Sequence, residues 1–171
     1  MSSDDLSRYR YTRTVLLEMA VAVEESAKEF YTTLSHKFSE HEALLNYLAE
    51  DEENHAKTYA KLLGKVEETY PTGGRKVEEV YPTEEERRQA DHNIQMLESL
   101  GLIGNLREGA SRAKEVADLG AALEAAVQLE KDTLLFYQNL AMGLGKEDRQ
   151  EVYRIIKVEH SHLYRLQNLD L

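Results

Sequence analysis

Apolar residues recur at alternating steps of three and four along four stretches of the chain, which is the spacing of the buried face of a bundle helix. The first such stripe begins at Leu17 and ends at Phe38, with polar residues at most other positions. The other three stripes have the same spacing and a similar length. The pattern predicts four long helices, over residues 13–38, 40–63, 118–142 and 146–169.

Two of the connections between these helices are short. Ser39 and Glu42 have the spacing of a capping box that opens the second helix, and Gly64 is a natural C-terminal stop for it. Only a few residues, around Gly143, separate the third helix from the fourth. Because short connections make neighbouring helices antiparallel, we expect an all-α fold. It should be a four-helix bundle of two antiparallel hairpins, joined by a long crossover over residues 64–117.

The crossover contains a repeated segment. Val-Glu-Glu-Thr-Tyr-Pro-Thr at residues 66–72 recurs as Val-Glu-Glu-Val-Tyr-Pro-Thr at residues 77–83, and both prolines of the chain lie in it. Proline and the glycine pair between the two copies favour a loop or a small extended hairpin. We assign no chemistry to this segment.

Helix signals return after the repeat. Thr83 and Glu86 form a second capping-box pattern, which predicts an accessory helix over residues 84–99. Between residues 102 and 117, glycines interrupt the apolar pattern. We therefore expect a short helix or an irregular segment there.

Composition is consistent with one helical domain over residues 1–171 and restricts its chemistry. The chain has 2 Pro and 9 Gly, which suits long helices better than a sheet with many turns. It contains no cysteine, which excludes thiolate catalysis, disulfides and cysteine-held iron–sulfur clusters within these residues. Any metal ion must therefore be bound by oxygen and nitrogen atoms.

Charge and hydropathy argue against several kinds of partner. A net charge of -11 repels nucleic acids and anionic membranes, and no run of Lys and Arg offsets it. Charged residues such as Glu18 and Glu24 cut the apolar runs well short of a membrane span. The N-terminus lacks the basic and apolar regions of a signal peptide. We expect a cytoplasmic protein that binds neither nucleic acid nor membrane.

Two Glu-x-x-His segments carry the strongest chemical signal. Glu52 precedes His55 by three residues, and Glu159 likewise precedes His162. On a helix this spacing places both side chains on one face, one turn apart, where they can bind the same metal ion. The other histidines have no such glutamate and are predicted to lie on the surface or in turns. The acidic run at 50–53 is predicted to face solvent, apart from Glu52.

Two further glutamates, Glu24 and Glu130, interrupt the stripes of the first and third helices. All of these ionisable residues lie near the middles of their helices, so antiparallel packing brings them to one level of the core. Four ionised carboxylates there would cost several kcal/mol each without compensation. Two divalent cations would balance them, with the imidazoles completing the coordination. The candidate ligands are Glu24, Glu52, His55, Glu130, Glu159 and His162.

The two halves of the chain repeat around these residues. Glu130 follows Glu24 by 106 residues, and Glu159 follows Glu52 by 107. In both halves a Phe-Tyr pair comes next, with its tyrosine seven residues after the first glutamate. The sequence therefore predicts a site with pseudo-twofold symmetry.

This arrangement resembles that of the ferritin-like di-iron carboxylate proteins, and among them the rubrerythrin group. The resemblance covers the four long helices and every candidate ligand. It implies a ferritin-like bundle in which Glu52 and Glu159 bridge two iron ions and carry the catalytic chemistry. Carboxylate and imidazole ligands also accept manganese or zinc. The resemblance further implies that Glu24 and His55 bind one ion and that Glu130 and His162 bind the other.

The resemblance also implies that tyrosines lie behind the metal ligands. Tyr31 and Tyr137 would hydrogen-bond a carboxylate, whereas the alternative for them and for Tyr59 is a core position with a satisfied hydroxyl.

The chain departs from the rubrerythrin pattern in two ways. Thr133 stands where rubrerythrins place an additional carboxylate. Full-length rubrerythrins also carry a cysteine-rich rubredoxin domain, which a chain without cysteine cannot form. An external electron donor protein is therefore expected.

Three functional hypotheses follow. The first is a di-iron oxidoreductase of rubrerythrin type, which reduces hydrogen peroxide or dioxygen with external electrons and protects against oxidative stress. The second is a ferroxidase or iron-handling protein. The third is a non-catalytic structural bundle that holds zinc or manganese, or a partner-binding subunit. A homodimer is expected for this fold.

Overall fold

The computed structural model describes residues 9–69 and 82–169, and within these ranges the chain is helical and has no strand. Four long helices make up most of it: α2 (Arg13–Lys37), α3 (Glu42–Thr69), α7 (Leu119–Met142) and α8 (Lys146–Gln167). A 3-10 turn, η1 (Ser39–His41), joins α2 to α3. Between α3 and α7 lie α4 (Glu84–Ser99), α5 (Leu102–Leu106) and α6 (Gly109–Glu115).

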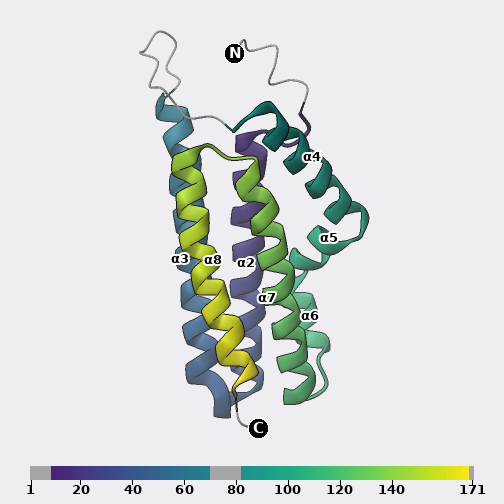
Figure 1. Ribbon diagram of the computed structural model, residues 1–171. Coiled ribbons are helices and arrows are strands. Elements are labelled where there is room, and N and C mark those ends of the chain that lie inside the picture. The colour runs from purple at the N-terminus through teal and green to yellow at the C-terminus, as the bar shows by residue number, and fades with distance from the viewer. Residues whose placement is uncertain (1–8, 70–81, 170–171) are drawn as a thin grey trace.

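Figure 1 shows the four long helices side by side as a bundle, with α4, α5 and α6 along one flank next to α7. Short connections join α2 to α3 at one end of the bundle and α7 to α8 at the other, so each pair is an antiparallel hairpin. The segment from α4 to α6 crosses from the first hairpin to the second. The predicted all-α bundle of two hairpins with a long crossover is confirmed.

Side-chain caps hold the starts of three helices. The Thr83 hydroxyl accepts from the Glu86 N–H at 3.2 Å, and the Glu86 carboxylate accepts from the Thr83 N–H at 2.7 Å, which confirms the predicted capping box of α4. Thr12 caps α2 and Asp118 caps α7 by accepting from a backbone N–H three residues further on. These bonds satisfy N–H groups that have no partner within the helix.

The second long helix ends later than predicted. α3 continues through Gly64 to Thr69, so the predicted end at residue 63 is wrong. A glycine inside a helix costs only ~1 kcal/mol relative to alanine, and the continuing ladder of backbone hydrogen bonds offsets that cost. Residues 66–69, predicted to begin a loop, are therefore helical. The rest of the repeated segment, at 70–81, lies outside the described residues.

The predicted capping box at Ser39 is also wrong. Ser39 lies inside η1, whose start at Phe38 has no side-chain cap. Backbone groups close the turn instead, because the Phe38 N–H donates to the Leu34 carbonyl at 2.9 Å and the His41 N–H donates to the Phe38 carbonyl at 3.0 Å. The Phe38 side chain packs against the core and anchors this connection.

The crossover lies directly against α2. Gly101, with a φ of 77°, separates α4 from α5 in a conformation that favours glycine. At the start of α6, the Gly109 N–H donates to the Ser26 hydroxyl at 2.8 Å, and a Cβ atom on Gly109 would lie 2.1 Å from the Ser26 carbonyl oxygen. Only glycine allows this approach. The contact supports α2 two residues away from Glu24.

Apolar side chains close the interior of the bundle on both sides of the candidate ligands. On α2, the buried residues Leu17 and Leu34 lie before and after Glu24 in the same stripe. Phe30 and Phe136, both buried, come from the two halves of the repeat. Polar residues interrupt these helices often enough that none of those described is long and apolar enough to cross a membrane.

Candidate metal centre

The six predicted ligands converge in the middle of the bundle. α2 and α7 each contribute one glutamate, and α3 and α8 each contribute a Glu-x-x-His pair. Their potential ligand atoms form two groups, and the atoms of each group lie within 4.8 Å of one another. The groups share two residues, Glu52 and Glu159; one group adds Glu24 and His55, and the other adds Glu130 and His162.

The cluster is shielded from solvent. Glu24, Glu159 and His162 have no exposed surface, and the other three residues are buried as well. Ionised carboxylates in such a place lose their hydration, at a cost of several kcal/mol each unless nearby positive charge compensates it. A fold that accepts four of them at one level requires that compensation.

Each imidazole directs its Nδ1 atom toward the shared carboxylates. The Nδ1 of His55 lies 2.8 Å from a Glu159 oxygen and 3.1 Å from a Glu52 oxygen. The Nδ1 of His162 lies 3.1 Å from the other Glu159 oxygen and 3.4 Å from the other Glu52 oxygen. The two imidazoles therefore make matching contacts from the two halves of the repeat, as the pseudo-twofold pattern predicts.

The electrostatics of the cluster favour added positive charge. Burial raises the pKa of Glu24 and of Glu130 well above the usual range of a glutamate, since the ionised form loses its hydration and faces other carboxylates. Burial by itself disfavours a charged imidazole, but the hydrogen bond to Glu159 and the other carboxylates outweigh it and raise the pKa of His162 to about 12. The pKa of His55 is raised for the same reasons. Groups that hold protons this strongly form a site at which cations can take their place.

The donor atoms fit two divalent cations. The Oε2 atom of Glu24 is buried and has no hydrogen-bond partner among the described residues, which leaves it free for a ligand. Two atoms bound to one ion at ~2.1 Å lie at most ~4.2 Å apart. A group whose atoms lie within 4.8 Å therefore needs to close by only a fraction of an ångström. Carboxylate oxygen and imidazole nitrogen together suit iron, manganese or zinc.

Two tyrosines hydrogen-bond to the cluster across the bundle. The Tyr137 hydroxyl on α7 donates to Oε1 of Glu24 on α2 at 2.6 Å, and the Tyr31 hydroxyl on α2 donates to Oε1 of Glu130 on α7. These are the contacts that the family resemblance implies. Tyr59 is buried with its ring centroid 5.3 Å from that of Tyr137, but its hydroxyl has no hydrogen-bond partner in the described part of the chain.

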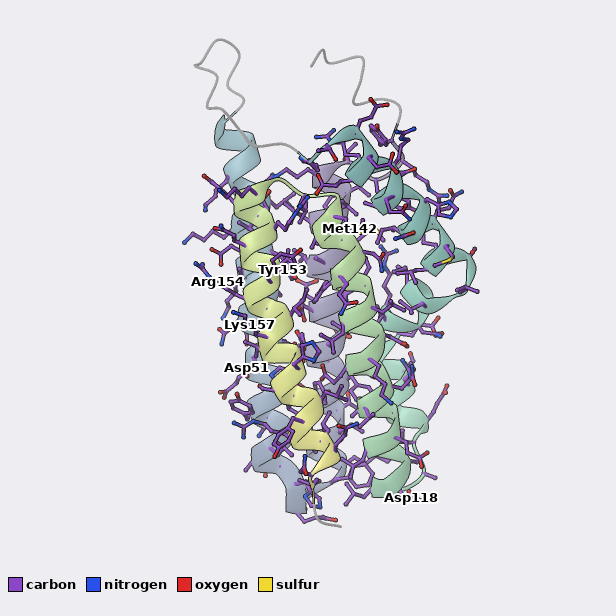
Figure 2. All side chains as sticks on the ribbon, viewed as in Figure 1. Asp51, Asp118, Met142, Tyr153, Arg154 and Lys157 are labelled. Atoms are coloured by element: carbon purple, nitrogen blue, oxygen red, sulfur yellow. The ribbon has the colours of Figure 1, made fainter. Side chains whose placement is uncertain are left out.

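The prediction of a solvent-facing acidic run is wrong at Asp51. Its Oδ2 atom accepts a hydrogen bond from Nε2–H of His162 at 3.0 Å, so α3 reaches across to α8 behind the imidazole. Figure 2 labels this residue beside α8. The sequence offers little indication of this contact, because Asp51 belongs neither to the apolar stripe of its helix nor to a Glu-x-x-His pair. Its position directly before Glu52 could have identified Asp51. Successive side chains on a helix differ in direction by about 100°, so the neighbour of a buried ligand can face the adjacent helix.

The other histidines lie outside the cluster, as predicted. His36, His92 and His160 are exposed, and His41 lies in η1. Thr133 is buried one turn beyond Glu130. That position therefore offers a hydroxyl where the rubrerythrin group places a further carboxylate.

A comparison with protein-family models supports the interpretation of the site. The Rubrerythrin model matches residues 16–170, a range that includes the four long helices and all six cluster residues. Neither the curated proteins nor the solved structures contain a match to this chain. The matched residues contain no cysteine and therefore no rubredoxin site. With its ferritin-like helix pairs and a family match over most of its length, the chain belongs to the rubrerythrin family.

Proposed function

We propose that this protein is a di-iron oxidoreductase that reduces hydrogen peroxide or dioxygen with electrons from an external donor protein. The proposal rests mainly on two buried groups of ligand atoms that share Glu52 and Glu159. Metal ions with shared ligands are close enough to act together in a two-electron step. Membership of the rubrerythrin family supports the same chemistry.

Each residue of the cluster has a part in this proposal. Two iron ions bound there would supply the two electrons that the oxidant takes up. Glu52 and Glu159 would lie between the ions, because each belongs to both groups. The hydroxyls of Tyr31 and Tyr137 would hold the two outer glutamates in place. The ions would be held individually by Glu24 with His55 and by Glu130 with His162.

Thr133 favours a second candidate function, a ferroxidase or iron-handling protein. Thr133 is buried where the rubrerythrin group places an additional carboxylate, so the cluster has six ligands and lacks the extra carboxylate on which the redox-linked ligand shift of those peroxidases depends. A ferroxidase reacts faster with dioxygen than with peroxide and then releases or accumulates Fe(III). The relative rates with the two oxidants therefore separate the two functions.

The test is to load the metal-free protein with Fe(II) without oxygen, count the bound iron, and mix parallel samples with hydrogen peroxide and with dioxygen. We expect about two iron ions per chain and fast oxidation by peroxide. Glu52→Ala should abolish the fast reaction, because it removes a ligand common to both groups. Glu53→Ala is the matched control, because Glu53 is next to Glu52 in the sequence but its carboxylate pairs with Lys28 and Lys57 outside the cluster.

Three results would contradict the proposal. Clearly fewer than two iron ions per chain would argue against a dinuclear site. An unchanged oxidation rate in Glu52→Ala would show that the reaction occurs elsewhere. Tight metal binding without turnover, accompanied only by a gain in stability, would support the structural metal bundle instead.

A further inference from the structure

The two halves of the site differ behind their imidazoles. Behind His162 lies Asp51, the residue directly before Glu52 on α3, and its carboxylate accepts a hydrogen bond from Nε2 of His162 at 3.0 Å. The corresponding position of the other half, directly before Glu159, is Val158. The valine side chain has no hydrogen-bonding group, and among the described residues none is hydrogen-bonded to the Nε2 atom of His55. One imidazole is therefore held at both nitrogens and the other at one.

A second difference lies on the same side. The Tyr47 ring packs edge-on against His162, with the ring centroids 6.3 Å apart, and the Arg165 guanidinium lies over Tyr47 at 5.0 Å. The residue that repeats Tyr47 at an offset of 107 is Arg154, which is exposed and pairs with Glu151 within α8. Figure 2 labels Arg154 on the outer side of the bundle. Accordingly, the side chain of His162 is 0% exposed and that of His55 is 8% exposed.

A hydrogen bond to the outer nitrogen of an imidazole changes how strongly the other nitrogen binds a metal ion. A carboxylate can only accept a hydrogen bond, so Asp51 would keep a proton on Nε2 of His162 when a metal ion displaces the proton on Nδ1, and the Nδ1 lone pair would then be available to the ion. Asp51 also fixes the ring orientation and makes Nδ1 more basic. Partners of this kind typically contribute 10–100-fold to metal affinity. Among the described residues His55 lacks such a partner at Nε2, so its orientation depends on the contacts of Nδ1 alone.

We infer that the two metal positions are unequal: the position of Glu130 and His162 binds a divalent ion more tightly and fills first, and Asp51 is the positioning residue that sets the difference. This inference rests on the dinuclear site of the proposed function. It adds an order of filling and assigns that order to one residue outside the ligand set.

The test uses Co(II) as the probe, because its visible absorption reports each coordination step. Titration of the metal-free protein should show two steps with affinities that differ by about 10–100-fold. His162→Ala should remove the tighter step and leave the weaker one, and His55→Ala should do the reverse. Asp51→Ala should weaken the tighter step by about 10–100-fold and leave the other unchanged. Asp51→Asn keeps an acceptor oxygen and should lie between Asp51→Ala and the unaltered protein.

Two further variants serve as controls. Glu50→Ala removes a negative charge from the same acidic run at an exposed position and should change neither step. Val158→Asp introduces the missing carboxylate behind His55 and should tighten the weaker step. Far-UV circular dichroism of each variant confirms that the helices are intact.

The possible failures are distinguishable. Two equal steps in the unaltered protein, or equal weakening of both steps by Asp51→Ala, would overturn the inference and leave the dinuclear site standing. If cobalt does not bind at all, the proposed function fails together with the inference.

Discussion

The hydroxyls of Tyr137 and Tyr59 lie in the same buried region, but only that of Tyr137 has a hydrogen-bond partner. Tyr137 donates to Glu24 at 2.6 Å, whereas the Tyr59 hydroxyl has no partner among the described residues. When a buried hydrogen-bond donor is removed, the acceptor that it served is left unsatisfied and the protein loses stability. When a buried hydroxyl without a partner is removed, no other group loses a hydrogen bond. The two tyrosines therefore form a matched pair for measuring what a bond to the cluster contributes.

We predict that Tyr137→Phe lowers the free energy of unfolding of the metal-free protein by about 1–3 kcal/mol, because Oε1 of Glu24 loses its donor. Tyr59→Phe should be neutral or slightly stabilising. Urea denaturation followed by circular dichroism measures both. Equal losses in the two variants would mean that the hydrogen bond to Glu24 has no special weight.

At the scale of helices, two glycines have opposite roles. Gly109 brings α6 against α2, where a Cβ atom would lie 2.1 Å from the Ser26 carbonyl oxygen. Gly64 lies inside α3, and a Cβ atom added to it would have no neighbour within 4 Å among the described residues. A methyl group at the first position must push two helices apart, while at the second it meets only open space.

We predict that Gly109→Ala destabilises the protein by ~1–3 kcal/mol through forced separation of α2 and α6. Gly64→Ala should stabilise it by up to ~1 kcal/mol, because alanine is the better helix former. Thermal unfolding compares the two variants directly. Since α2 also carries Glu24, Gly109→Ala should in addition weaken metal binding. A variant that unfolds like the unaltered protein would show that α6 packs loosely on α2.

At the scale of the whole molecule, the proposed metal ions would compete with protons for one cluster. The pKa values of Glu24, Glu130 and both histidines are raised by their buried, carboxylate-rich surroundings, so these groups hold protons more strongly than the same side chains do in water. Metal ions bind the deprotonated forms and must displace those protons. The apparent affinity for metal should therefore rise with pH and fall as the solution is acidified.

We predict that loading with Zn(II) at neutral pH releases up to about four protons per two ions, one from each of these groups. Calorimetry in buffers with different ionisation enthalpies counts them. His162→Ala, which keeps only the position of Glu24 and His55, should bind one ion and release up to about two protons. Metal affinity that is independent of pH would contradict this account.

Much of the architecture follows from local pattern. The alternating three and four spacing indicates which face of each long helix is buried, and Thr83 with Glu86 marks the start of α4 because a cap depends on residues three apart. The candidate ligands were identifiable for the same reason. A Glu-x-x-His pair lies on one helical face whatever surrounds it, and its repetition at an offset of 107 shows that the two pairs belong together.

Other features could not be predicted from a local sequence pattern. Gly64 looks like a helix stop, but a continuous hydrogen-bond ladder carries α3 to Thr69. Gly109 shows its purpose only where α6 meets α2. Asp51 looks like one more solvated acid until α8 brings His162 within 3.0 Å of it. Helical period and spacing are properties of neighbouring residues, so the sequence alone determined the bundle and its six candidate ligands. Tertiary structure decided the inequality of the two halves, because that inequality arises from side chains more than a hundred residues apart.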